Sequence, residues 1–450
     1  MLALFRNDRR FWVRLWTLVL PIMGQNFIQS SLGAVDVFMV GQLNETAVAG
    51  LGLADQLFFL LILFLFGVGS GAAIFSAQAW GKQDLPQIHS VMGMSLVLAF
   101  VGAVFFAIIS LVFPEQIIGL YTPDTAVIAV SASYLRVVGW SYVATAASVV
   151  FGSVLRSIEE VRLPLVVSFF SLGLNSVFNY LLIFGKFGFP ELGVQGAAIA
   201  TAGARWVECL ILVGLIYRWR LPVAANLRQM AAVTRPFAKL FLLTTLPVIA
   251  TEIAWSVGQT LYNGFYARIG TESIAAINIA VTIERLAFIV FIAMGSAASV
   301  MIGNRLGAGE KDRAMLYAKR FLILQFGLAC MLGLFLFSVS GWVPGLYNIS
   351  AEAASYTTAV LRVMSAAVLI KSANLMAFIG IIRPGGDTRV GLLMDIGPLW
   401  LLGVPLAYVG TFILGYSVVW VYTLSVVEEV AKLGFALWRI SSRRWMKAVV

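Results

Sequence analysis

Long apolar segments follow one another along almost the whole chain, and they constrain its fold more than any other feature. A helix needs about 20 apolar residues to cross a bilayer, and runs of that length recur with only short polar stretches between them. Of the 450 residues, 60% are hydrophobic and 12% are charged, whereas soluble domains carry about 25% charged residues. A water-exposed surface cannot be built from this composition, so the sequence predicts an all-α integral membrane protein.

Twelve membrane-spanning helices are expected from these runs. They cover residues 13–41, 47–77, 91–113, 125–155, 163–185, 194–217, 239–267, 273–303, 318–341, 353–382, 390–412 and 417–438. The first run has a basic flank, as a signal peptide would, but it continues to about Gly41 without a small-residue cleavage site. We therefore interpret it as an uncleaved first helix.

Basic residues are distributed very unevenly between the predicted loops. When alternate loops are assigned to opposite sides, one side takes nearly all of them, and the other holds little beyond Lys186 and Arg268. The positive-inside rule then places both termini in the cytoplasm of a multi-pass protein of the plasma membrane, which is the inner membrane in a bacterium. The net charge of +10 is therefore a signal of orientation, and no nucleic-acid partner is expected.

The two halves of the sequence repeat each other. Pro247 lies 226 positions after Pro21 (247 − 21), and the same offset relates Gly69 to Gly295 and Leu135 to Leu361. Six helices per repeat is an even number, so both halves should enter the membrane in the same orientation. We expect an N-terminal lobe over residues 1–217, a solvated cytoplasmic connector over 218–238 and a C-terminal lobe over 239–450.

Four stretches of sequence resemble one family of secondary transporters. They are LPIMGQNFIQSSLGAVDVFMVGQL from Leu20, LNSVFNYLLIFGKFGFPELGVQGAAIAT from Leu174, LPVIATEIAW from Leu246 and IIRPGGDTRV from Ile381. On these motifs the chain resembles the multidrug and toxic compound extrusion (MATE) family, and the likeness covers nearly its whole length. The Asp-Arg-rich loop expected of the major facilitator family after the second helix is absent.

The resemblance implies twelve transmembrane helices in two six-helix repeats around a central cleft. It also implies an antiporter that exports amphipathic, often cationic drugs or metabolites and uses H⁺ or Na⁺ as its coupling ion, with no other cofactor. Its expected partners are those small molecules and the lipid bilayer, and we expect a monomer.

Two other classes of protein are alternatives to the exporter. A lipid-linked precursor flippase of the same superfamily typically has a more cationic central cleft, and Lys371, Arg285 and Arg205 keep this alternative open. No enzyme is expected, because the single histidine, His89, has no metal-ligand or nucleophile pattern around it.

Charged residues inside the predicted spans are candidates for the coupling site, because an ionised side chain at the centre of a membrane helix costs about 2.5–3.5 kcal/mol. Asp36 stands out in the first lobe, since its neighbours along the helix are apolar or small. Burial disfavours the ionised form of a carboxyl group, so Asp36 could take up and release a proton.

The resemblance places Asp36 at the cation site of the family, together with Asn175, Asn179 and Thr201. The two asparagines are four positions apart and share one helix face. Their oxygens could bind Na⁺ beside Asp36 or hydrogen-bond its carboxyl group. Asn179 departs from the DinF-like branch, which often has a second aspartate there. H⁺ is the favoured coupling ion, and Na⁺ at Asp36 is the metal-ion alternative.

The second lobe has different chemistry at the equivalent positions. The repeat pairs Asp36 with Tyr262, and it pairs Glu252 with Asn26. The NorM-like branch has a helix 10 aspartate near Lys371, and this departure argues against a NorM-type Na⁺ site. A buried lysine there could pair with Glu252 or with Asp395.

Three further residues complete the predicted mechanism. Glu284 is a fourth charged candidate within a span of the second lobe. Pro21 and Pro247 each remove a backbone hydrogen bond inside a span, so they are expected to kink helices 1 and 7.

Overall fold

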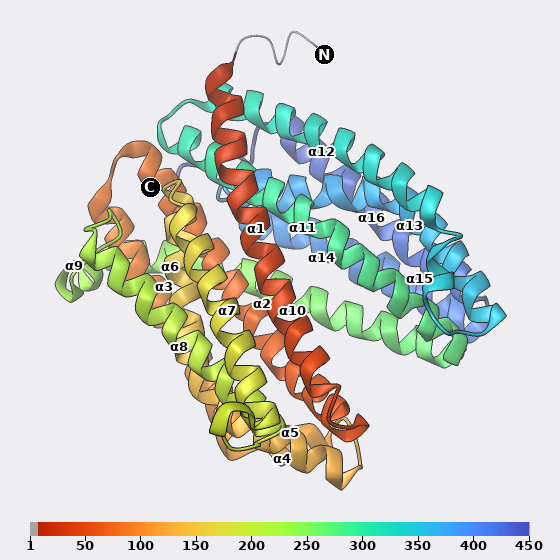
Figure 1. The fold of residues 1–450 in the computed structure, drawn as a ribbon. Helices are drawn as coiled ribbons and strands as arrows, with labels where there is room; N and C mark the ends of the chain where they lie inside the picture. The colour runs from red at the N-terminus through yellow and green to blue at the C-terminus, as the bar shows by residue number, and fades with distance from the viewer. Residues whose placement is uncertain (1–7, 450) are drawn as a thin grey trace. The chain divides into compact units, whose positions relative to one another are not determined.

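The computed structural model describes residues 8–449 and forms that part of the chain from helices joined by short loops (Figure 1). Within it there is no β-strand, and ten helical segments are long and apolar enough to cross a membrane. Two other long helices of this part, α1 (Arg9–Val40) and α16 (Val418–Ser441), lie outside that set and contain four charged residues each. Together these twelve segments agree with the predicted spans to within seven residues at every end, which confirms the twelve-helix fold class.

The chain forms two compact units whose boundaries lie inside helices. The N-terminal unit is Leu20–Ile249, and the C-terminal unit takes the chain from Ala250 onward together with the residues up to Val19. Both boundaries fall within three residues of a proline, Pro21 in α1 or Pro247 in α10. Since a proline inside a helix breaks a backbone hydrogen bond, these two helices pass from one unit to the other at the positions where the sequence predicts kinks.

The N-terminal unit contains the first ten helices except for the start of α1 and the end of α10. Their bounds are α1 (Arg9–Val40), α2 (Glu45–Lys82), α3 (Leu85–Val112), α4 (Pro114–Gly119), α5 (Thr125–Val138), α6 (Tyr142–Ser157), α7 (Arg162–Phe184), α8 (Val194–Arg218), α9 (Leu227–Ala231) and α10 (Arg235–Ile269). A 3₁₀ turn over Gly139–Ser141 joins α5 to α6, so together they form one span.

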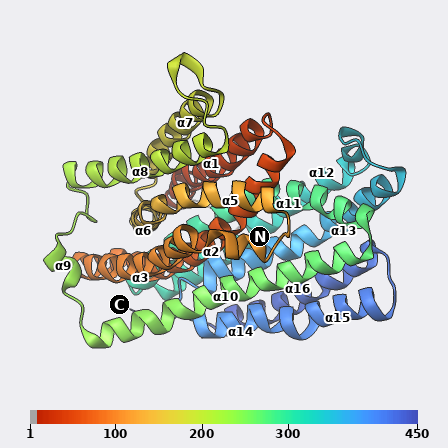
Figure 2. The ribbon, with the colours of Figure 1, turned by 90° about the horizontal axis from the view of Figure 1, so that it is seen from below.

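The C-terminal unit contains the remaining helices. Their bounds are α11 (Thr271–Gly307), α12 (Lys311–Val339), α13 (Ala351–Leu375), α14 (Thr388–Pro398), α15 (Val404–Tyr408) and α16 (Val418–Ser441). Three π-helical turns, Met376–Ile382, Leu399–Gly403 and Val409–Ile413, continue α13, α14 and α15. Figure 2 shows α16 running alongside α14 and α15. Such π turns often mark functional sites.

Aromatic packing holds the first part of α1 in the C-terminal unit and the first part of α10 in the N-terminal unit. Phe11, near the start of α1, lies 5.1 Å from the ring of Tyr317 and 5.6 Å from that of Phe321, both on α12. In the N-terminal unit, Phe241 at the start of α10 lies 5.4 Å from Phe75 on α2. The first parts of α1 and α10 are therefore core elements of the units in which they lie.

The connector predicted as a solvated linker is exposed over most of its residues, and three of its apolar side chains, Val223, Ala225 and Met230, are buried. Pro222 O lies 2.9 Å from His89 Nε2, and Ala232 O accepts a hydrogen bond of 3.0 Å from Ser90. Gly93 on α3 allows the backbone of the connector to approach so closely that a Cβ there would overlap it. Met230 is buried where the short helix α9 of the connector packs against α3.

Asp387, in the turn before α14, fastens the C-terminal segment to its unit. Its fully buried carboxylate accepts hydrogen bonds from Arg439 Nε at 2.6 Å and from Lys447 Nζ at 2.5 Å. Trp445, between those two residues, is also fully buried.

We expect Asp387→Asn to lower the stability of this unit by about 1–3 kcal/mol, because it removes the charge that two cations share in a buried place. Thermal unfolding of the purified protein in detergent checks this. Asp312→Asn is the matched control, since its partner Arg443 and Asp312 itself are mostly exposed and such pairs contribute little. Equal melting temperatures for the two variants would contradict the role of Asp387.

Candidate functional site

Four polar side chains predicted for the coupling site meet inside the N-terminal unit. Asp36 lies on α1, Asn175 and Asn179 lie on α7, and Thr201 lies on α8. Helices α7 and α8 run side by side (Figure 1). Asp36 is 5% exposed, Thr201 is 6% exposed and both asparagines are fully buried. The structure therefore brings together all four residues that the sequence proposed, from three helices.

The four side chains form a closed ring of hydrogen bonds. Asn179 Nδ2 donates to Asp36 Oδ1 at 2.5 Å and to Asn175 Oδ1 at 3.3 Å. Asn175 Nδ2 donates to Thr201 Oγ1 at 3.2 Å, and Thr201 donates to Asp36 Oδ2 at 3.0 Å. Both carboxylate oxygens of Asp36 are thus held by neutral donors, and Asp36 forms no ion pair with a described residue. Such a group is suited to gain and lose a single charge.

Two residues near Asp36 were missed in the sequence. Asp55 on α2 is half-buried and lies within electrostatic range of Asp36. Tyr134 on α5 is buried and also lies within electrostatic range of both aspartates. Asp55 could have been found by the argument that selected Asp36, because it too is an acid within an apolar span. Nothing in the sequence pattern identifies Tyr134.

A buried ion pair lies further along α8. Arg205 donates to Glu208 at 3.1 Å, and Glu208 also accepts a hydrogen bond of 2.9 Å from Ser168 on α7. Both charged residues are less than 10% exposed. The cation of Arg205 is therefore compensated by its own neighbour on the helix, although it remains within electrostatic range of Asp36.

The acids and bases of the C-terminal unit pair differently from the two alternatives that the sequence left open. Lys371 on α13 contacts neither Glu252 nor Asp395. Its ammonium group lies 2.6 Å from Glu284 on α11, with the hydroxyl of Tyr422 at 3.3 Å. The sequence suggested the wrong partners because it does not determine how α11 and α13 are rotated about their axes.

Glu252 and Asp395 have basic partners that the sequence does not indicate. Arg383, just after the first π turn, donates to Glu252 on α10 at 2.7 Å. Lys432 on α16 lies 3.5 Å from Asp395 on α14. The four acids and bases selected for the second lobe thus belong to two clusters, one around Lys371 and one around Arg383 and Lys432. Two further acids of α16 lie 3.4 and 3.6 Å from the ammonium group of Lys432, and they are Glu428 and Glu429.

The two repeats differ in charge at one pair of nearly equivalent positions, which hold an acid in the C-terminal unit and a neutral amide in the N-terminal unit. Arg383 faces the carboxylate of Glu252, whereas Arg156 at the end of α6 faces the neutral amide of Gln25 on α1 at 3.3 Å. Gln25 and Glu252 lie four and five residues after the prolines of their helices. The same scaffold therefore supports an ion pair in one unit and a neutral contact in the other.

Gln25→Glu tests this difference in the N-terminal unit, because it places a carboxylate beside the guanidinium of Arg156. Hydrogen bonds between charged partners contribute about 1.5–3 kcal/mol, more than neutral ones. We therefore expect a higher melting temperature in thermal unfolding of the purified protein. An unchanged or lower one would mean that desolvation of the new charge outweighs the attraction.

None of the arrangements in the described residues resembles a metal centre made of three or more His, Cys, Asp or Glu side chains. The ring around Asp36 has one carboxylate with amide and hydroxyl oxygens. Those oxygen atoms fit H⁺ exchange, and they also have the chemistry for a hard monovalent cation.

Sequence comparison identifies relatives over almost the full chain. The sequence is 28% identical over 437 residues to "Probable multidrug resistance protein NorM" of Rhizobium meliloti (strain 1021), covering 94% of this chain and 92% of that protein. It is 27% identical over 405 residues to "Multidrug resistance protein MdtK" of Pectobacterium atrosepticum, covering 88% of this chain and 86% of that protein.

Solved structures share the same fold. "Crystal structure of MATE in the bent conformation" has a TM-score of 0.87 at 20% identity and covers 98% of both chains. "Outward-facing conformation of a multidrug resistance MATE family transporter of the MOP superfamily." has a TM-score of 0.86 at 21% identity and covers 96% of both.

The family match reproduces the internal repeat. The sequence model of the MatE family matches two segments of the chain, residues 21–181 and 247–409. These segments begin at Pro21 and Pro247, the two prolines of the repeat. The chain therefore belongs to the MatE family of multi-pass membrane transporters, the multidrug and toxic compound extrusion family.

Proposed function

We propose that this transporter exports amphipathic, often cationic compounds by alternating access and that an inward flow of protons drives it. Asp36 is the coupling carboxyl group in this proposal. The observation that carries it is the ring around Asp36, in which a buried acid is held by neutral hydrogen-bond donors and has no ion-pair partner among the described residues. The printed names of the relatives, multidrug resistance proteins, support the substrate class.

The geometry of the ring favours H⁺ over Na⁺. An amide N–H and a hydroxyl are directed at the two carboxylate oxygens, so two of the nearest polar groups act as donors, whereas a bound Na⁺ needs oxygen lone pairs directed at it. The half-buried acid Asp55 lies within electrostatic range of Asp36, and a proton bound to either acid removes the repulsion between two carboxylates. We propose that protonation changes the preferred conformation of α1. A bound proton can do so only if the two conformations bind it with different affinities.

Pairing of the buried cations supports the exporter over a lipid-linked precursor flippase. Flippases of this superfamily are expected to have a more cationic cleft, and Arg205 and Lys371 are two of the residues that suggest it. Each of them is paired with an acid in its own unit. Both cations are therefore compensated by an acid and are less able to bind an anionic lipid head group.

Vesicles that contain the purified protein test this function. We expect a pH gradient that drives H⁺ inward to power efflux of a fluorescent organic cation, and an equal Na⁺ gradient at constant pH to have no effect. Efflux driven by a Na⁺ gradient alone would show that the coupling ion is Na⁺ and not H⁺. Movement of a lipid-linked sugar across the bilayer, without movement of the dye, would show that the protein is a flippase and not an exporter.

A further inference from the structure

The C-terminal unit buries more acids than bases. Five carboxyl groups lie in its two linked clusters, and three cations face them. The acids are Glu252, Glu284, Asp395, Glu428 and Glu429, and the bases are Lys371, Arg383 and Lys432. If all were ionised, the clusters would carry two uncompensated negative charges inside a membrane-spanning unit. Buried charge without compensation is strongly disfavoured, so this excess is relieved most easily by bound protons.

The excess is concentrated around Lys432. Its ammonium group is shared by Asp395, Glu428 and Glu429 at 3.4–3.6 Å. The carboxylate of Glu429 is further stabilised by Asn374 on α13, which donates a hydrogen bond to it at 2.7 Å. Asp395 is within electrostatic range of a second cation, the guanidinium that pairs with Glu252. Glu428 faces no second cation among the described residues, and it is therefore the carboxyl group least stabilised as an anion.

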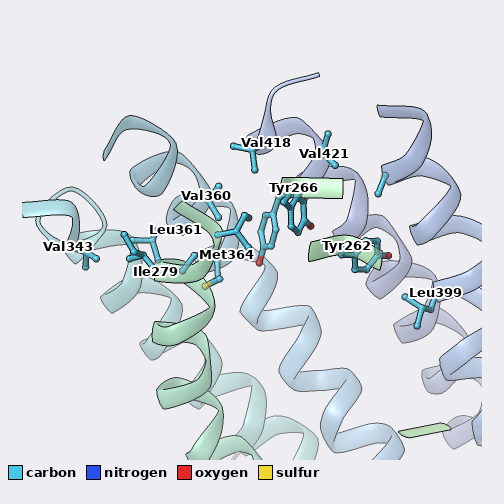
Figure 3. Packing of buried hydrophobic residues seen from close by; sticks show 14 residues of the cluster. Tyr262, Tyr266, Ile279, Val343, Val360, Leu361, Met364, Leu399, Val418 and Val421 are labelled. Carbon is cyan, nitrogen blue, oxygen red and sulfur yellow. The ribbon is translucent and has the colours of Figure 1, made fainter. Parts of the chain in front are cut away.

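An unpartnered hydroxyl faces Glu428. Tyr262 on α10 is 4% exposed and Glu428 is 2% exposed, yet Tyr262 OH and Glu428 Oε2 are both without a hydrogen-bond partner in the described structure. Both atoms point at Gly403 in the second π turn, where a Cβ would overlap each of them. Figure 3 shows Tyr262 between Tyr266, on whose ring it stacks with the centroids 6.5 Å apart, and Leu399, the first residue of that turn. The glycine allows both buried oxygens to approach the backbone of this turn closely.

The position of Tyr262 corresponds by repeat to that of Asp36. Tyr262 lies 226 positions after Asp36 (262 − 36), the same offset as between the two prolines. In the N-terminal unit the acid is on the first helix of the repeat and its hydroxyl partner is on the last, α8. In the C-terminal unit the hydroxyl is on the first helix of the repeat, α10, and the acid is on the last, α16.

From this exchange of roles and the unpartnered oxygens we propose that Glu428 is a second proton-exchanging carboxyl group, with Tyr262 as its hydrogen-bonding partner. In this step a proton leaves the Glu428 carboxylic acid for water and the carboxylate that remains is held by the ammonium group of Lys432, which stays charged. The groups that face it are Lys432 and Glu429 on α16, Asp395 on α14 and Tyr262 on α10. Helix α16 lies outside the segments matched by the MatE family model, so the family match assigns no role to Glu428.

The inference rests on the proposed function, because a second exchangeable proton matters to a proton-driven transporter, but its test does not use transport. Infrared difference spectra of the full-length protein in lipid nanodiscs, between alkaline and acidic pH, report the C=O band of a protonated buried carboxyl group. We expect Glu428→Gln to remove one such band. Glutamine has the shape of a protonated glutamate, so the variant should keep the cluster folded. Tyr262→Phe should keep the band and shift its frequency, because it removes the hydroxyl that faces the acid.

Asp36→Asn is the matched control, since it changes a carboxyl group of the other unit and should leave the Glu428 band in place. Loss of the band in Glu428→Gln supports the inference, and so does a frequency shift in Tyr262→Phe if the first variant does not fold. A band that is present in Glu428→Gln and unmoved in Tyr262→Phe overturns it. Proton-driven efflux by Asp36→Asn would instead overturn the proposed function, so the two failures are distinguishable.

Discussion

Asp36→Asn is expected to reduce proton-driven efflux to the level of vesicles without the transporter. Asparagine has the same shape as aspartic acid and can still bond Asn179 or Thr201, but its side chain does not titrate between a neutral and a charged state. The ring of hydrogen bonds should survive with small changes, whereas the difference between a charged and a neutral state is lost. Since a ligand shifts a conformational equilibrium only through differential binding, the proton gradient can no longer drive the transporter.

The measurement is the rate of dye efflux from vesicles after an acid jump, with the amount of folded protein determined in each preparation. Glu115→Gln is the matched control in the same unit. Glu115 pairs with Arg136 at 2.5 Å, and both side chains are 42–50% exposed, so its loss should change neither stability nor efflux much. Full efflux by Asp36→Asn, with an intact pH dependence, would remove Asp36 from the coupling role.

Glu252→Gln is expected to have the largest effect on stability. The substitution leaves the guanidinium of Arg383 buried without its counter-charge, and breaking a buried pair in this way costs about 3–5 kcal/mol. Arg383 is 6% exposed, and its Nη1 atom already lacks a hydrogen-bond partner in the described structure. The amide oxygen that the substitution introduces is neutral, so it is too weak an acceptor to compensate for the lost charge.

Thermal unfolding in detergent measures this loss, and the double variant Glu252→Gln with Arg383→Gln provides the control. We expect the double variant to recover a large part of the lost stability, because no buried charge is then left unpaired. A double variant that is less stable than Glu252→Gln alone would show that the pair does not act as a unit.

The helices and the duplication could be predicted from the sequence because both depend on local patterns. Each span is an apolar run of sufficient length, and the prolines and glycines of the two halves keep one offset over many residues. The ring around Asp36 was predicted from the resemblance to a family whose motifs contain these positions. Asp55 was accessible by the same rule that selected Asp36, since it too is an acid inside an apolar run.

The partners of the other charged residues could not be predicted in the same way. Lys371 has several acids at similar depth in the C-terminal unit, and the choice of Glu284 depends on the rotation of α11 and α13 about their axes. Packing of the connector against α3 likewise depends on contacts between residues far apart in the chain.

The sequence by itself determined that the chain is a duplicated bundle of membrane helices, because a bilayer requires long apolar runs and each helix satisfies its own backbone hydrogen bonds. Only the tertiary structure decided which buried acid meets which cation. It also brought Tyr262 to Glu428, through a π turn and a glycine that no periodicity predicts. These pairings depend on the relative rotation and approach of helices, which the packing of side chains from distant segments determines.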